Sequence, residues 1–304
     1  MDQPAEATLD EPRIEIPTAK SLFIEAYFDD QLLGSATCFL LTRTKETNCV
    51  VLTNRHVVTG RHQETNKPLD KKNGAVPNAV VIHFHKEGAA LGEWTQIRLP
   101  LYRQTDEPYW IEHPRLGAQA DVVALNLTWG NDVAQYPYYL DLELDRPKMV
   151  LSPAEPVSVI GFPFGLASHA RYPIWATGFL AQDLSFVSPE HPRFFIDCRS
   201  RQGQSGSPVI AFRAQGARLI KDGKPVANLT PNPTWEFLGI YSGRINEESD
   251  IGIVWHVSVL GELFDAAIAD AATRKQRWAE ANAVTVLEAG ETPSEDVLAE
   301  PSAD

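Results

Sequence analysis

The chain has 304 residues, of which 27 are basic and 40 are acidic, so its formal net charge is −13 at pH 7. This acidic balance argues against a nucleic-acid partner, because neutralising phosphates requires clustered Lys and Arg. Apolar residues make up 43% of the chain, an ordinary share for a globular protein with a sizeable core. No apolar run approaches the ~18 residues that a spanning helix requires, so we expect no membrane partner.

Residues 1–18 predict a flexible leader. They begin MDQPAEATLDEPRIEIP, which is acidic and broken by proline, and which lacks the basic start and apolar stretch of a secretory signal. The three cysteines, Cys38, Cys49 and Cys198, are odd in number and have no CxxC spacing. We therefore expect buried thiols in a reducing compartment rather than a disulfide framework, and a cytoplasmic location.

From Leu22 onward the chain is a succession of short predicted strands. They are rich in Val, Ile, Phe, Tyr and Trp, and Gly, Pro, Asn and Asp clusters separate them. In chain order they are LFIEAYF, SATCFLL, NCVVLT, AVVIHFH, WTQIRLPL, DVVALNL, VSVIGF, IWATGFLA, FFIDC, SPVIAF, WEFLGIYS and IGIVWHV. About a dozen strands without regularly intervening helices favour an all-β fold of one or two antiparallel barrels, and disfavour a parallel βαβ sheet.

Helical periodicity appears only near the C-terminus, where GELFDAAIADAATRKQRWAEANA predicts a helix over 261–283. Its apolar stripe contains Leu263, Phe264, Ala267, Ile268 and Ala271, with Trp278 close to the same line. The basic residues Arg274, Lys275 and Arg277 lie toward the helix C-terminus, where the helix dipole favours cations, although a solvated face is the simpler explanation. Residues 284–304 are acidic with no Lys or Arg, which predicts a disordered tail.

The most informative segment is RQGQSGSPVIAF, residues 201–212, in which Ser205 lies between Gly203 and Gly206. Gly, Ser and Pro together are typical of turns, so a plain loop is the first interpretation. A linker does not explain why a strand, VIAF, follows at once. The alternative is a nucleophilic serine placed where backbone N–H groups can stabilise a developing oxyanion.

A nucleophilic serine needs a base and a group that orients the base. His56 directly follows a strand in VVLTNRHVV, and Asp121 stands at the entrance of an apolar strand in GAQADVVALNL. Taken alone, each is more often a structural or surface residue. Together with Ser205 they supply the nucleophile, base and carboxylate of acyl transfer, in which His56 takes the Ser205 proton and Asp121 holds the imidazole tautomer.

These segments resemble the chymotrypsin/trypsin-like serine proteases, and most closely their bacterial high-temperature-requirement branch. The matching stretches are GSATCFLL, TNRHVV, DVVAL, VIGFPFG and GQSGSP, and the resemblance extends with gaps from about residue 22 to 263. It implies a chymotrypsin-like peptidase domain over residues 19–283. This domain would have two six-stranded antiparallel β-barrels, an active site in the cleft between them, a C-terminal helix and no metal or organic cofactor.

The resemblance also implies roles for residues around the serine. The backbone N–H groups of Gly203 and Ser205 would form the oxyanion hole. The strand FLGIYSG would pair with the substrate backbone through Ser242 and Gly243, and Ser242 would hydrogen-bond Asp121.

For the substrate residue whose carbonyl is attacked, called P1, the resemblance implies a side-chain pocket bordered and left open by Gly252. Arg199, Ser200 and Gln202 would form another wall. Arg199 raises the possibility of an acidic P1 residue, although an arginine that points to solvent or to a structural carboxylate is the favoured interpretation.

Two departures from the family pattern matter. Secreted relatives made as zymogens carry an Asp before the serine that pairs with a newly cut N-terminus, whereas this chain has the uncharged Gln204. We therefore expect activity without N-terminal processing. Too few residues follow the predicted helix to build the PDZ domain that high-temperature-requirement relatives usually carry.

His83 and His85 alternate onto one face of a predicted strand, as paired metal ligands can, but no third ligand stands at supporting spacing. A surface strand without metal is the favoured interpretation. The leading functional hypothesis is a cytoplasmic serine endopeptidase acting on proteins or peptides through an acyl-enzyme intermediate. The alternatives are a catalytically silent relative that binds peptides in the same cleft, and an adaptor whose late helix or acidic tail recruits a protein partner.

Overall fold

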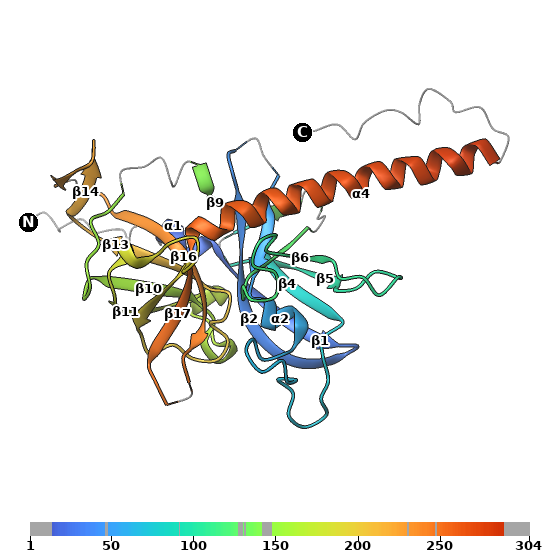
Figure 1. Ribbon diagram of the computed structural model, residues 1–304, viewed down its shortest axis with the longest axis horizontal. Coiled ribbons are helices and arrows are strands. Elements are labelled where there is room, and N and C mark those ends of the chain that lie inside the picture. The colour runs from blue at the N-terminus through green and yellow to red at the C-terminus, as the bar shows by residue number, and fades with distance from the viewer. Residues whose placement is uncertain are drawn as a thin grey trace, which may run out of the picture.

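The computed structural model describes residues 14–45, 48–90, 92–126, 130, 132–141, 148–229, 231–246 and 248–288. Residues 1–13 of the predicted leader and residues 289–304 of the predicted tail lie outside this description. Two β units stand side by side, and one long helix starts beside the C-terminal unit and runs across the N-terminal unit and beyond it (Figure 1).

The N-terminal unit is a curled sheet of nine strands, antiparallel except for one parallel pair, β2 with β9. Its main path has the order β5-β4-β1-β2-β3-β7-β6, while β8 pairs with β4 and β9 with β2. The strands are β1 (Ser21–Phe28), β2 (Gln31–Thr42), β3 (Val50–Thr53), β4 (Ala79–Lys86), β5 (Trp94–Pro100), β6 (Trp110–Glu112), β7 (Val123–Leu125), β8 (Val133–Ala134) and β9 (Tyr138–Tyr139). Two short helices flank them, α1 (Ile16–Ala19) and α2 (Arg55–Thr59).

The C-terminal unit is a closed barrel with the strand order β10-β11-β12-β17-β16-β13. A separate hairpin, β14-β15, projects from its side (Figure 1). The strands are β10 (Pro156–Gly161), β11 (Ile174–Leu180), β12 (Arg193–Asp197), β13 (Pro208–Arg213), β14 (Ala217–Lys221), β15 (Lys224–Asn228), β16 (Thr234–Arg244) and β17 (Ile251–His256). The predicted all-β, chymotrypsin-like architecture is confirmed, with the difference that the N-terminal unit is a curled sheet instead of a second closed six-stranded barrel.

Alternating burial explains why these segments form strands. In β12, Phe194 and Ile196 are buried while the residues on either side of them face outward, which is the two-residue period of a strand with one apolar face. One apolar cluster contains residues of both units and of the long helix and so joins them to one another. It includes Phe39, Ile160 and Leu260. Because fully burying each such side chain contributes roughly 1.5–3 kcal/mol, this shared cluster fixes the two units in one relative position.

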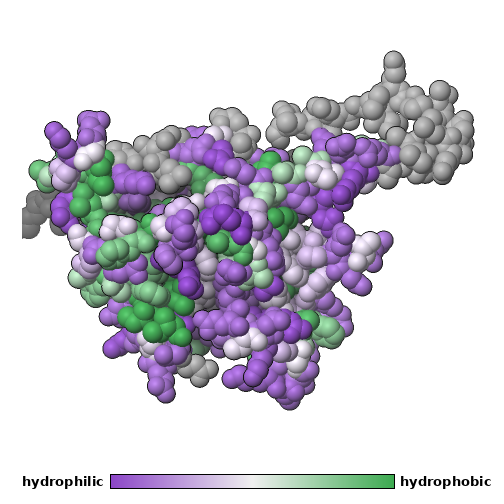
Figure 2. Space-filling view, in the orientation of Figure 1, coloured by the Kyte–Doolittle hydropathy of each residue, from purple (hydrophilic) through white to green (hydrophobic). Residues whose placement is uncertain are grey.

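Helix α4 (Leu260–Glu288) begins one residue before the predicted start and continues five residues beyond the predicted end. Leu263 and Phe264 are buried in the shared apolar cluster. Trp278, expected near the same stripe, is 71% exposed. The outer part of the helix extends beyond the two β units (Figure 1), and the stretch of it that is coloured in Figure 2 presents mainly hydrophilic residues. No described helix is long and apolar enough to cross a membrane.

The three thiols are free, as predicted: Cys38 and Cys198 are buried and Cys49 is half-buried. Burial raises the pKa of Cys49 and of Cys198 to about 11. At neutral pH both therefore remain thiols, the form that is inert as a nucleophile.

The interpretation of β4 as a surface strand was wrong, because His83 and His85 are both buried. His83 Nε2 lies 2.9 Å from the Glu25 carboxylate, and His85 Nε2 lies 2.8 Å from the carbonyl oxygen of Ala19. Each ring is thus held by a partner within the fold. Among the described residues, no group of three or more His, Cys, Asp or Glu side chains is arranged to hold a metal ion.

His256 makes the stability of the fold depend on pH. Its Nδ1 accepts a hydrogen bond from the backbone N–H of Ser258 at 3.2 Å and so caps the turn that leads into α4. Burial, and secondarily the positive charge of Lys148, lowers the pKa of His256 to about 4. An unfolded histidine titrates near ~6.5, so between these values the unfolded chain binds more protons than the folded one.

We therefore expect the free energy of unfolding to fall as pH decreases from about 6.5 toward 4. Urea titrations at pH 7, 5.5 and 4.5 measure this slope. The variant His256→Asn keeps an acceptor for the cap but cannot take up the proton, so its slope should be shallower than that of the wild type. Equal slopes for the two proteins would contradict the prediction.

Candidate active site

The turn that joins β3 to α2 positions His56. The strand ends at Thr53, and the buried Asn54 donates a hydrogen bond from Nδ2 to the carbonyl oxygen of Asp121 at 2.6 Å. Helix α2 is only five residues long and is followed by the capping residue Gly60, whose left-handed φ of 61° lets its N–H donate to the carbonyl oxygen of His56. This anchored turn presents the imidazole ring at the edge of the N-terminal sheet.

The carboxylate of Asp121 is 1% exposed and accepts three hydrogen bonds. Its Oδ1 accepts from the backbone N–H of His56 at 2.9 Å, and its Oδ2 lies 2.7 Å from Nδ1 of the same ring. The hydroxyl of Ser242 also donates to Oδ2, as was predicted. Because an ionised carboxylate only accepts, Nδ1 carries the ring proton and Nε2 is left as the acceptor.

Ser205 lies on the loop between β12 and β13, between two glycines that the backbone requires. Gly203 and Gly206 have φ of 95° and 82°. An added Cβ would lie 2.3 Å from the carbonyl oxygen of Phe162 at the first position and 2.0 Å from that of Thr37 at the second. Only glycine fits both the conformation and the space.

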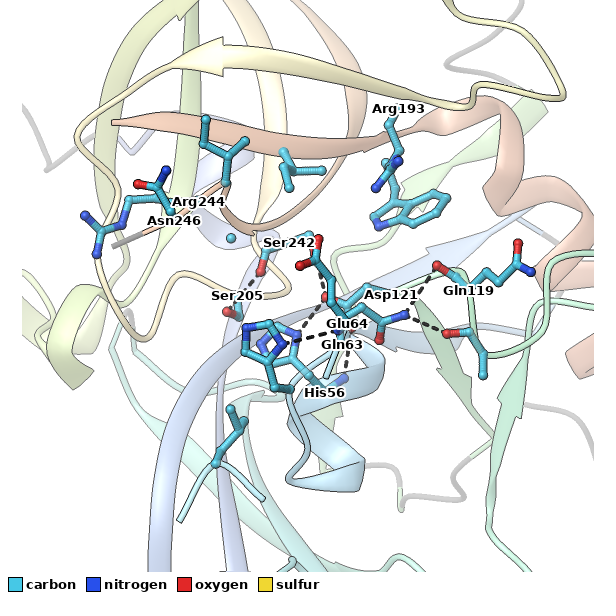
Figure 3. Close-up of a pocket in the computed structure, with 17 residues that line it drawn as sticks. His56, Gln63, Glu64, Gln119, Asp121, Arg193, Ser205, Ser242, Arg244 and Asn246 are labelled. Carbon is cyan, nitrogen blue, oxygen red and sulfur yellow. Dashed lines mark hydrogen bonds and ion pairs between the residues drawn. The ribbon is translucent and has the colours of Figure 1, made fainter. Parts of the chain in front are cut away.

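The side chain of Ser205 lies beside the His56 ring (Figure 3). Its hydroxyl donates to the carbonyl oxygen of Ser242 at 3.3 Å instead of to the ring. The structure thus brings the side chains of His56, Asp121 and Ser205 close to one another (Figure 3). Catalytic hydrogen bonds are often long or misaligned in enzymes without substrate, so this geometry does not argue against catalysis.

The loop also leaves two backbone N–H groups beside Ser205 without an acceptor. Within the described residues, neither the amide of Gly203 nor that of Ser205 donates a hydrogen bond. The carbonyl oxygen of Gln202 accepts from the N–H of Phe164 at 2.6 Å. Because C=O and N–H point in opposite directions across a trans peptide, this contact turns the Gly203 N–H away from Phe164. The two amides are the ones expected to form the oxyanion hole.

Thr37 of β2 anchors the Ser205 loop by hydrogen bonds. The sequence analysis did not single out this residue. Its N–H donates to the carbonyl oxygen of Ser205 at 2.9 Å, and its hydroxyl donates to that of Gly203 at 3.0 Å. Thr37 is fully buried, and the hydroxyl of Thr53 donates to its carbonyl oxygen in turn. The only signal in the sequence was a hydroxyl-bearing residue within the apolar strand SATCFLL.

Two cavities meet at His56 and Ser205. One, of about 620 Å³, includes Asp121, Ser242 and Gly243 in its lining. The other, of about 570 Å³, extends along the opposite side, toward Gly34 and Lys71. The reactive side chains therefore lie in the middle of a longer cleft.

A family model described as "Trypsin-like peptidase domain" matches residues 36–217, which is more than half of the chain and includes His56, Asp121 and Ser205. The chain belongs to this family. No curated protein matches the chain.

Solved structures similar to this peptidase domain include three proteases. A serine endoprotease from Yersinia pestis has 12% identity and a TM-score of 0.45, with 86% of this chain and 69% of that chain covered. The active form of a protease from M. tuberculosis has 16% identity and a TM-score of 0.40, with coverage of 81% and 80%. A thermostable serine protease from an extremophilic microorganism has 9% identity and a TM-score of 0.44, with coverage of 84% and 99%.

The residues predicted to line the P1 pocket of the peptidase domain are only partly brought to the cleft. Gln202 lines the 570 Å³ cavity, whereas Arg199, Ser200 and Gly252 line neither of the two cavities. The Arg199 side chain is 85% exposed and lies 3.9 Å from the carboxylate of Asp250. This position corresponds to the favoured interpretation of Arg199, a contact with a structural carboxylate.

Gln204, where zymogen-type relatives carry an Asp, is fully buried. Its Oε1 accepts a hydrogen bond from the N–H of Arg201 at 2.7 Å. The loop of this trypsin-like peptidase is thus braced by a neutral contact between two of its own residues.

Proposed function

We propose that this trypsin-like peptidase is a serine endopeptidase that hydrolyses peptide bonds through Ser205, His56 and Asp121. The observation that carries the proposal is the fully hydrogen-bonded carboxylate of Asp121, 2.7 Å from the ring of His56, with Ser205 beside that ring. Burial of the carboxylate and its three donors fix the ring in the tautomer that can accept the serine proton.

In the proposed reaction the Ser205 oxygen attacks the carbonyl carbon of the substrate while its proton passes to Nε2 of His56. The C–N bond then breaks, the amine product leaves with that proton, and an ester to Ser205 remains. Water attacks the ester, with His56 again accepting a proton and returning it to Ser205. The acid product is released, and the enzyme is restored.

The amides of Gly203 and Ser205 are proposed to bind the oxyanion of each tetrahedral intermediate. Their support is the absence of any acceptor for them within the described fold. Each such donor typically contributes about 3–4 kcal/mol of transition-state stabilisation. Endopeptidase action is supported by the cavities on both sides of Ser205, because an internal peptide bond needs room for chain in both directions.

Three further points belong to the proposal. The neutral bracing of Gln204 supports activity without N-terminal processing. The three free thiols support a reducing compartment, for which we propose the cytoplasm. The motifs TNRHVV and GQSGSP support membership of the high-temperature-requirement branch.

One observation favours a second candidate, a silent peptide-binding relative: the Ser205 hydroxyl donates to Ser242 instead of to His56. Fluorophosphonate labelling separates the two candidates, because it requires an activated serine whose oxygen displaces fluoride from phosphorus.

We expect the wild type to be labelled, Ser205→Ala to be unlabelled, and His56→Ala to be labelled at least about 100-fold more slowly. Ser188→Ala is a matched control that removes a serine hydroxyl bonded to Glu190 and to the backbone N–H of His191, outside the cleft, and it should be labelled like the wild type. An unlabelled wild type, or a labelled Ser205→Ala protein, would reject the proposed peptidase.

A further inference from the structure

Strand β16 leaves an open edge next to the nucleophile. Its pairing with β13 ends at Ile240, and beyond it the backbone of Tyr241 bonds to Gly206 and Ser207. Among the described residues, no strand pairs with residues 242–244 on that side. An extended substrate can therefore add to this edge with its scissile carbonyl at Ser205.

The contacts of two neighbouring side chains of β16 indicate where the P1 side chain has to go. Ser242 directs its hydroxyl to Asp121, toward the His56 side of the strand. The side chain of Tyr241, one residue earlier, points instead into the core of the barrel, where its hydroxyl contacts that of Ser200. When the scissile carbonyl of a substrate faces Ser205 and His56, the P1 side chain points away from the imidazole. It is then directed toward the space that the Tyr241 side chain occupies.

That space is filled by the Tyr241 ring. The residue is 2% exposed and belongs to the apolar core of the barrel. Its hydroxyl is hydrogen-bonded to the hydroxyl of Ser200, which is itself fully buried. A Cβ added to Gly252 would lie 2.6 Å from Cε2 of this ring. The missing side chain at Gly252 thus accommodates the Tyr241 ring instead of leaving an open pocket.

We propose that Tyr241 closes the P1 pocket from within, so that the enzyme accepts only small P1 residues such as Gly, Ala and Ser. This inference rests on the proposed function and names the substrate class of the same site. It replaces the expectation of an open pocket and leaves no route for a P1 carboxylate to reach Arg199.

A large P1 side chain would have to expel the ring from the core. It would also break the bond between Tyr241 and Ser200 and leave two buried hydroxyls without partners, which is costly. The expected discrimination between P1 Ala and P1 Phe is therefore on the order of 100-fold or more. Nothing comparable restricts neighbouring substrate residues at Gly243, where an added Cβ would meet no atom within 4 Å.

The test uses two capped peptide diphenyl phosphonates that differ only in carrying an Ala-like or a Phe-like P1 side chain. The Ser205 oxygen displaces phenol from phosphorus, so the rate of inactivation reports P1 fit without requiring a known substrate. We expect the wild type to react about 100-fold faster with the Ala probe. Tyr241→Val should lower this ratio to below about 3-fold, whereas Tyr241→Phe, which keeps the ring, should retain the preference for Ala.

A fluorophosphonate without a P1 side chain, applied to each variant, counts the folded active sites. If the wild type fails to react with it, the proposed function falls, and this inference falls with it. If the wild type reacts with it but is inactivated equally fast by the Phe and Ala probes, only the inference is overturned. The same holds if a fully labelled Tyr241→Val protein keeps the 100-fold ratio. Tyr241→Ala leaves a larger opening and can be used in the same comparison. If neither variant folds, the ratio of wild-type inactivation rates with the Ala and Phe probes still tests whether the P1 pocket is closed.

Discussion

Replacing Asp121 with Asn is expected to lower kcat/KM for peptide hydrolysis by about 10⁴-fold at pH 7. The amide oxygen of Asn can still accept from the backbone N–H of His56, which now bonds Oδ1 at 2.9 Å. Its NH₂ group then faces Nδ1 and turns that nitrogen into an acceptor. The ring proton moves to Nε2, which can no longer take the proton of Ser205.

Two companion variants separate this tautomer effect from a general loss of charge. Ser242→Ala removes one of the three donors to Asp121 but leaves the tautomer unchanged, so a decrease of only about 10-fold is expected. Asp265→Asn removes a carboxylate of helix α4 that pairs with Arg43 and lines neither cavity, so it should retain wild-type kcat/KM. A loss below about 100-fold for Asp121→Asn would contradict the proposed role of Asp121.

Replacing Gly203 with Ala is expected to lower kcat by about 10²–10³-fold with little change in KM. The added Cβ would lie 2.3 Å from the carbonyl oxygen of Phe162, so the backbone must shift and carry its N–H away from the oxyanion. The N–H acts mainly in the transition state, which is why kcat is affected more than KM.

Gly223 provides the matched control for Gly203. It also has a positive φ, 72°, but an added Cβ there would meet no atom within 4 Å. Gly223→Ala therefore carries a similar backbone strain, about 1 kcal/mol, without touching the cleft. Its kcat should equal that of the wild type.

Thr37→Val removes the hydroxyl bonded to the Gly203 carbonyl. Like Gly203→Ala it should lower kcat, by about 10-fold. If Gly203→Ala kept kcat within about 3-fold, the oxyanion assignment would be wrong.

The sequence predicts that His56, Asp121 and Ser205 act together because each stands in a short motif and the three motifs together resemble those of one protease family. The glycines on either side of Ser205 are typical of a turn, and in the structure both have a positive φ. The contact between Ser242 and Asp121 could be anticipated only through the resemblance, since 121 positions separate the two residues in sequence.

The closure of the P1 pocket could not be predicted in this way. The register of β16 shifts between Tyr241 and Gly243, and the position of the Tyr241 ring depends on Gly252 and Ser200, which come from other strands and loops. Packing among distant segments decides such a position. The same reason applies to Thr37, whose role arises from a loop 166 residues away, and to the open N-terminal sheet, whose curvature depends on strand register.

The nucleophile loop is fastened to both β units at once. Thr37 of the N-terminal sheet bonds to the carbonyl oxygen of Ser205, while Tyr241 of the barrel bonds to Gly206 and Ser207. A small separation of the two units is therefore expected to displace the backbone of Ser205, and with it the hydroxyl, before the protein unfolds globally. We therefore expect the reactivity of Ser205 to decrease when the contact between the two β units loosens, at temperatures or denaturant concentrations where circular dichroism still shows the folded protein.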